Sequence, residues 1–263
     1  MLAQTAAPGT SPPPRAQTPT APAPQVAPPP QAHSQPEFEA YQAAIDQTTA
    51  AAMEEAANKF VTAYRQSELR PLLLQHLLER FFKERNAEKT IATAHELLQL
   101  EPDNPVALVR SAAMLAETTG ESDLNHNERL MEAQKNAQRL VNTVDRSIAT
   151  LFNPNAPAEQ VEATRKNLLV MAYSALGKAD LDLKQYAQAE EALKQALKLF
   201  PANAQNLYRL ALSLDYQNRY SDALDAVNRS LENAQSTPAI VERAQRERER
   251  LQQLTQGSAA PRR

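Results

Sequence analysis

Apolar residues recur at helical spacing along most of the chain, and no segment shows the alternating, β-branched pattern of a strand. The clearest stripes place Leu77, Leu78 and Phe81 on one segment and Ala94 and Leu97 on the next. Stripes of this kind belong to amphipathic helices whose apolar faces meet. The pattern therefore predicts an all-α protein built of paired helices.

These stripes repeat with a fixed period. Leu176 aligns with Leu210 and Tyr186 with Tyr220, a shift of 34 residues in each case. A period of this size is typical of stacked helical hairpins, each too small to bury its own apolar face. We therefore expect one continuous helical array over residues 37–256.

Small residues mark where the two helices of a hairpin would cross. In the segment 173–201 they are framed by larger apolar residues and a closing proline: Gly177, Ala189 and Ala196, with Leu176, Tyr186, Leu197 and Pro201. This set resembles the tetratricopeptide repeat (TPR), which has small residues at its helix crossing. The resemblance implies a right-handed superhelical array of antiparallel helix hairpins. It also implies that the first helix of every repeat lines a concave groove that holds a peptide or a partner helix.

Prolines and capping residues suggest where the repeats begin and end, because Asn104-Pro105 and Thr237-Pro238 each place a cap before a first-turn proline. The first helix of the first repeat is expected from Glu37 to about Ala50. We predict repeats at about 37–70, 71–104, 105–169, 170–203 and 204–237, followed by a capping helix at 238–256 and a frayed end at 257–263.

The third predicted repeat, 105–169, departs from the regular length. Its second stripe runs long, breaks at Asn153-Pro154-Asn155 and resumes from Pro157 into the fourth repeat. The segment 126–183 is therefore expected to form two extended helices. They are either a stiffening antiparallel hairpin or a surface for docking and self-association.

The first 36 residues have a different composition. They hold 11 of the 19 prolines and one charged side chain, Arg15. Such a segment cannot bury enough apolar surface to fold, so we expect a disordered, extended tail that acts as a spacer. The alternative is a proline motif that a partner recognises. The opening Met1-Leu2-Ala3-Gln4 resembles a mature exported protein whose signal was removed, which would place the protein in the periplasm or outside the cell.

Charge and composition exclude several kinds of chemistry. A net charge of −3 without a basic stripe disfavours nucleic acid as a partner. Cysteine is absent, the four histidines show no metal-binding spacing, and no glycine-rich phosphate loop occurs. No apolar run is long enough for an integral membrane segment. We therefore expect a non-enzymatic protein that needs no cofactor and no metal.

The TPR resemblance gives the candidate binding residues, which are the positions expected on the groove wall. Lys178 and Arg209 would receive a carboxylate, and Tyr208 and Tyr216 would offer rigid contact area. The alternative for each is ordinary surface or packing within the array. The full set is Ser174, Lys178, Leu181 and Asp182 in the fourth repeat and Tyr208, Arg209, Leu212, Asp215 and Tyr216 in the fifth.

Taken together, these patterns predict a scaffold that binds another protein or peptide along its groove. The alternative is a structural component that self-associates as a weak homodimer through the extended hairpin of residues 126–183. A row of helix pairs has no enclosed polar site, so both interpretations concern surface rather than catalysis.

Overall fold

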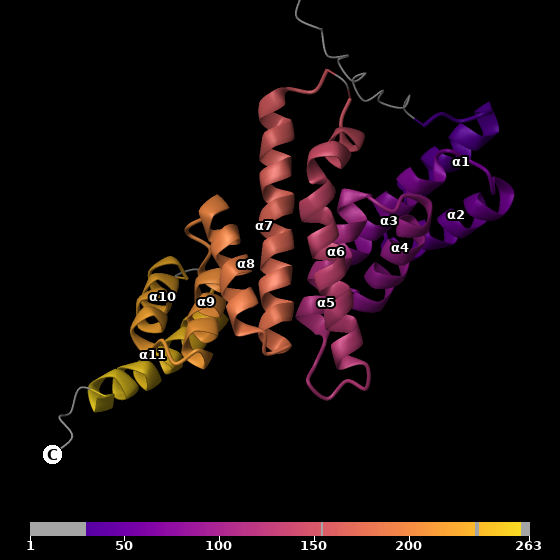
Figure 1. Ribbon diagram of the computed structural model, residues 1–263. Helices are drawn as coiled ribbons and strands as arrows, with labels where there is room; N and C mark the ends of the chain where they lie inside the picture. The colour runs from indigo at the N-terminus through magenta and orange to yellow at the C-terminus, as the bar shows by residue number, and fades with distance from the viewer. Residues whose placement is uncertain (1–29, 154, 235–236, 259–263) are drawn as a thin grey trace, which may run out of the picture.

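The computed structural model describes residues 30–153, 155–234 and 237–258, and in these residues it is all helical, as predicted (Figure 1). The expected disordered tail lies, up to residue 29, outside the described residues, but its last two expected residues, Gln35 and Pro36, already belong to the first helix. The first helices of successive pairs are α1 (Gln35–Ile45), α3 (Arg70–Lys83), α5 (Pro105–Thr118), α7 (Ala158–Asp182) and α9 (Ala204–Tyr216). The second helices are α2 (Ala50–Ala63), α4 (Ala87–Leu100), α6 (His126–Ser147), α8 (Tyr186–Leu199) and α10 (Tyr220–Asn233). A short 3-10 turn, η1 (Ile148–Leu151), follows α6, and α11 (Pro238–Ser258) ends the array.

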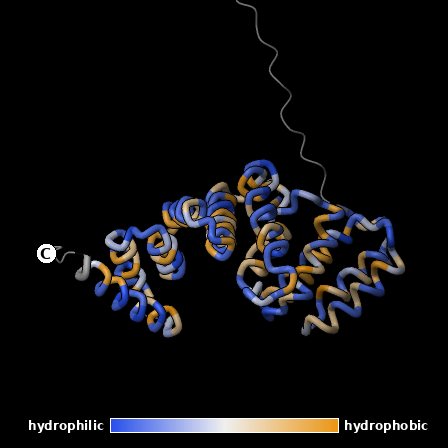
Figure 2. The backbone as a smooth tube through the Cα atoms, turned by 60° about the horizontal axis from the view of Figure 1, so that its bottom comes forward, coloured by the Kyte–Doolittle hydropathy of each residue, from blue (hydrophilic) through white to orange (hydrophobic). Residues whose placement is uncertain are grey.

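The helix pairs stand in an elongated, curved row, with α1 to α4 at one end and α10 and α11 at the other (Figures 1 and 2). Each first helix from α3 onward packs on the second helix before it and on the one after it, so no pair buries its apolar face alone. The interior is accordingly a chain of apolar clusters. The buried residues of the largest extend from α4 to α7, and a second cluster joins α8 to α11.

Polar caps start several helices where the sequence places them. The Asn104 side chain accepts from the amides of Val106 and Ala107 at 3.1 and 3.0 Å, directly before the first-turn Pro105. Thr49 accepts from the amide of Ala52 at 3.2 Å in the same way. Because these side chains satisfy amides that have no partner inside the helix, they fix where each helix begins.

Three of the turns between paired helices share one backbone conformation. Arg85, Lys184 and Asn218 have φ angles of 57°, 61° and 61°, in the left-handed region. In each case the amide of the next residue bonds to a carbonyl five residues earlier, as from Gln185 to Asp180 at 2.8 Å. This is the Schellman ending of a helix, which reverses the chain within a few residues and lets the second helix fold back.

The crossing of α7 and α8 explains the small residue at Gly177. A Cβ built on this glycine would lie 2.6 Å from the Cγ atom of Leu193, which is fully buried. The backbones of the two helices therefore approach more closely than any larger residue would permit.

Some of the expected boundaries differ from the structure. The first helix ends at Ile45 instead of reaching Ala50, because Thr49 caps a new helix that begins at Ala50. The boundary drawn between residues 169 and 170 falls inside α7, which is one continuous helix of 25 residues. At the C-terminus α11 continues through Gly257 to Ser258, beyond the expected end at residue 256, and residues 259–263 lie outside the described residues.

The extended helices of segment 126–183 are present. α6 has 22 residues and α7 has 25, whereas α5 and α8 have 14 each. In Figure 1 the upper part of α7 rises above α8 and is accompanied there by α6. Arg165 on α7 bonds to Asp145 on α6 at 2.6 Å, so the extra length is paired within the hairpin.

Candidate functional site

The candidate residues lie on α7 and α9, which are neighbouring first helices. A hydrogen bond joins the two helices at Ser174, whose hydroxyl accepts from the Asn206 side-chain amide at 2.7 Å. Tyr208, Leu212 and Tyr216 follow one another four residues apart and so share one face of α9. The structure thus places Ser174 against α9, and it places Tyr208, Leu212 and Tyr216 together on one face of that helix.

Three of the nine predicted residues are not accessible in this structure, which corrects that part of the prediction. Leu181, Arg209 and Asp215 are 8%, 4% and 9% exposed. Arg209 is paired with Glu117 of α5, and Asp215 with Arg250 of α11. Both charged side chains therefore hold helices of the array together instead of lining an open wall.

The other six residues are accessible, and we call them the α7–α9 surface. Tyr216 is the most exposed at 57%, and its ring stacks on that of Tyr186 at a centroid distance of 4.7 Å. Lys178 forms an ion pair with Asp182 one turn along α7, so its charge already has a partner. The half-buried members are Ser174, Lys178, Asp182, Tyr208 and Leu212.

The C-terminal helix modifies the environment of Tyr208. Burial is the main cause that raises the pKa of this phenol, and Glu247 of α11 adds to the effect while Arg243 and Arg246 oppose it. Since α11 packs on both α9 and α10, it covers the end of the second apolar cluster and borders the α7–α9 surface.

Two buried carboxylates lie close to this surface, and their pKa values are shifted in opposite directions. Burial raises the pKa of Asp180 to about 6, although a hydrogen bond from Gln134 of α6 opposes the shift. Burial would raise the pKa of Glu190 as well, but bonds from Lys194, Arg219 and Gln217 outweigh it and lower that pKa to about 2. These bonds thus hold Glu190 in its charged form, whereas ionisation of the Asp180 carboxyl group costs free energy.

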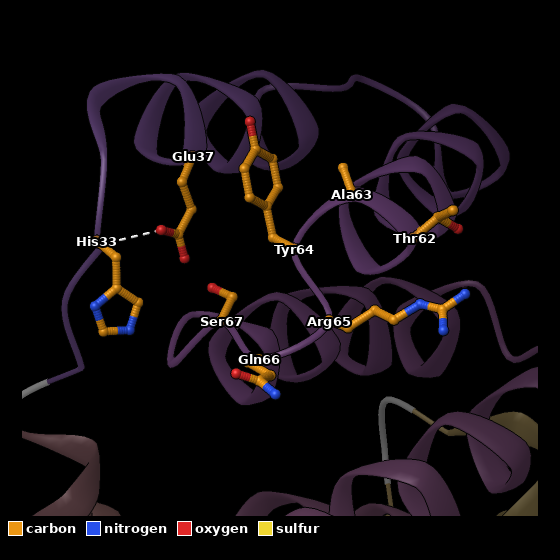
Figure 3. A pocket seen from close by; sticks show the side chains of 8 residues that line it. All are labelled: His33, Glu37, Thr62, Ala63, Tyr64, Arg65, Gln66 and Ser67. Atoms are coloured by element: carbon orange, nitrogen blue, oxygen red, sulfur yellow. Dashed lines mark hydrogen bonds between the residues drawn. The ribbon is translucent and has the colours of Figure 1, made fainter.

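A depression that the sequence did not reveal lies at the other end of the array. It has a volume of about 630 Å³ and is shallow and open; we call it the N-terminal depression (Figure 3). A smaller one beside it, of about 500 Å³, lies along residues 30–35 and Phe38. The sequence signal for this region is the capping box Ser34-Gln35-Pro36-Glu37, which places a glutamate at the start of α1. The residues that line the N-terminal depression are His33, Glu37, Thr62, Ala63, Tyr64, Arg65, Gln66 and Ser67.

Across the described ranges, no three acidic or histidine side chains are grouped so that they could hold a metal ion. None of the described helices combines the length and the apolar character needed to cross a membrane.

The geometry defines a class of protein, an all-helical solenoid of stacked antiparallel hairpins. Residues 180–246 match the family model described as "Tetratricopeptide repeat". The match covers α8 to α10 and part of α11, the region in which the 34-residue period is clearest.

Solved structures resemble this fold at low sequence identity. One, described as "MamA RS-1 ArsTM double mutant", has a TM-score of 0.52 and 16% identity, and the match covers 77% of this chain and 94% of that one. Another is a thermophilic TPR protein of Thermus thermophilus, with a TM-score of 0.46 and 16% identity over 80% of this chain and 98% of that one. Among curated proteins, none matches this sequence. The first likeness supports the solenoid fold.

Proposed function

We propose that this protein is a non-enzymatic interaction scaffold, and that the α7–α9 surface receives an extended peptide or a helix of a partner protein. TPR proteins generally mediate protein–protein interactions. The observation that carries the proposal is the row Tyr208, Leu212 and Tyr216, which stays accessible on one face of α9. Tyrosines supply large contact area at small entropic cost, and they are frequent in binding hot spots.

The burial pattern refines the mechanism. Because Arg209 is buried and paired, Lys178 is the cation best placed to meet a partner carboxylate, in exchange for its bond to Asp182. The exchange replaces one ion pair by another, so its net contribution to the free energy of binding is small. Binding energy then comes from burial of the two tyrosines and Leu212, and Lys178 sets orientation.

The test is affinity capture from native extract with the full chain carrying Tyr208→Ala and Tyr216→Ala. We expect the double variant to lose partners that the unchanged protein retains. Lys198→Glu, an exposed change on the second helix α8, is the matched control and should retain them. Circular dichroism of each variant verifies that the helices remain. If the double variant keeps the same partners as the control, the assignment of the surface is wrong.

Self-association through segment 126–183 is the second candidate, and the length of α6 and α7 is the observation in its favour. The exposed side chains of α6 count against it, since they are polar except for Met131, which is 52% exposed. Stable interfaces bury larger apolar areas than one methionine provides. Light scattering after size exclusion decides the matter: a dimer that Met131→Lys returns to monomer would establish the second candidate.

A further inference from the structure

Glu37 is a buried carboxylate that is only half satisfied. It lies in the first turn of α1 and is 3% exposed. One oxygen, Oε2, accepts from the backbone amide of His33 at 2.7 Å. The other oxygen, Oε1, has no hydrogen-bond partner among the described residues. Burying a charged group in this way is costly unless a donor completes it.

The free oxygen borders the N-terminal depression. Figure 3 shows the Glu37 carboxylate directed into the space between His33, Tyr64 and Ser67, whereas the Arg65 side chain extends away from it. The Ser67 hydroxyl faces the carboxylate and accepts from the amide of Leu69 at 3.1 Å. Oε1 itself has almost no exposed surface and faces the Ser67 hydroxyl, so a ligand group that enters this space reaches it by displacing that hydroxyl.

One acidic side chain, Glu37, and one basic side chain, Arg65, line the N-terminal depression. Within the described ranges, no lysine or arginine forms an ion pair with Glu37. A second carboxylate, Glu68, lies nearby, with Oε1 at 3.9 Å from Nε2 of His33. The facing Ser67 hydroxyl lowers the pKa of Glu37, and the His33 amide adds to this while burial opposes it. Glu37 is thus kept in its charged form.

We propose that the N-terminal depression binds the ammonium group of a lysine side chain on a partner protein, with Oε1 of Glu37 as the principal acceptor. A guanidinium needs two parallel acceptors for its fork, and the second oxygen of Glu37 is already engaged by His33. An ammonium is compact and needs one strong acceptor and room for its flexible stem. The depression is open, so the partner's backbone stays outside while the side chain reaches in. This contact lies at the opposite end of the array from the α7–α9 surface and does not depend on it.

The test uses the full chain, labelled with ¹⁵N, and Nα-acetyl-lysine amide as the probe. We expect changes in amide chemical shift confined to residues 33–38 and 62–68. The dissociation constant should be about tenfold larger for Glu37→Gln. Glutamine keeps an acceptor for the His33 amide, so α1 should remain folded. Glu39→Gln, an exposed change on the same helix, is the control and should bind the probe as the unchanged protein does.

Two further probes decide the source of the amine. Nα-acetyl-norleucine amide lacks the charge and should produce no shifts, while glycinamide carries only an N-terminal amine. Binding of glycinamide in preference to the lysine probe would overturn the assignment to a side chain. A second variant, Ser67→Lys, supplies an internal ammonium next to Glu37 and should abolish binding without altering α1. Equal binding to the unchanged protein, Glu37→Gln and Ser67→Lys would overturn the proposal.

Discussion

At the scale of single residues, the contact between Gly177 and Leu193 limits what the helix crossing accepts. Gly177→Ala adds a methyl group 2.6 Å from the Leu193 Cγ atom, and Leu193 is fully buried. The gain in helix propensity is about 1 kcal/mol, and overpacking costs about 1 to 3 kcal/mol. We expect a net loss of about 1 kcal/mol in unfolding free energy, measured by urea denaturation.

Gly120, in the loop after α5, offers a matched control. A Cβ on this glycine would meet its nearest neighbour, the Asp123 side chain, at 3.6 Å, which is an ordinary contact. Gly120→Ala should therefore leave the unfolding free energy unchanged or raise it slightly. A stabilised Gly177→Ala protein would mean that α7 and α8 separate without cost.

Asp180 should make stability depend on pH. Its pKa rises from the ordinary value of 3.8 to about 6, so the folded state binds the proton more tightly than the unfolded state. Stability then falls as pH increases from about 4 to 6, and the penalty is complete at pH 7. Asp180→Asn keeps an acceptor for Gln134 and should raise the unfolding free energy by about 1 to 3 kcal/mol at pH 7. At pH 3.5 the two proteins should differ little in thermal unfolding, and an equal difference at both pH values would contradict this account.

At the scale of elements, Glu190 connects α8 to the turn between α9 and α10. It accepts from Lys194 at 2.6 Å, from Arg219 at 2.7 and 2.8 Å and from Gln217 at 3.0 Å. The pKa of Glu190 falls from 4.5 to about 2, so this stabilisation is present above pH 4.5 and is lost as the pH falls towards 2.

Glu190→Gln should therefore lower the unfolding free energy by about 2 kcal/mol at pH 7. Guanidinium would screen the charge, so urea is the suitable denaturant. Glu191→Gln, which changes an exposed neighbour bonded to Gln195, should have almost no effect. Similar losses for the two variants would show that Glu190 is not the connecting residue.

The elements also show what the sequence could and could not predict. The helices, their phase and the crossing at Gly177 follow from local periodicity and small residues, and the all-α solenoid was predicted correctly. The burial of Arg209 was not predictable, because its partner Glu117 is 92 residues away and no periodic signal links the two. The left-handed backbone conformation of Lys184, with a φ angle of 61°, was missed as well, because a lysine in the sequence does not indicate such a turn. Contacts between distant positions require the folded chain.

At the scale of the whole molecule, the pair of Glu117 and Arg209 joins α5 to α9 across the intervening first helix. Glu117→Ala removes this link and leaves a buried guanidinium without its carboxylate. Because Glu117 is itself half exposed, we expect a loss of about 1 to 2 kcal/mol, less than for a fully buried pair. The radius of gyration from small-angle scattering should increase as the row opens. Glu121→Ala, an exposed change of equal charge in the loop after α5, should alter neither quantity.

The length of α7 has a consequence for how the protein tolerates being cut. One part of this helix contributes Leu168, Leu169 and Ala172 to the cluster that begins at α4, while its Gly177 receives Leu193 from the cluster that ends at α11. Proteolytic cleavage anywhere between α6 and α8 would leave apolar surface on both fragments without its packing partner. Neither fragment should then stay soluble by itself. In this region the row therefore behaves as a single cooperative folding unit, although it is built of repeats.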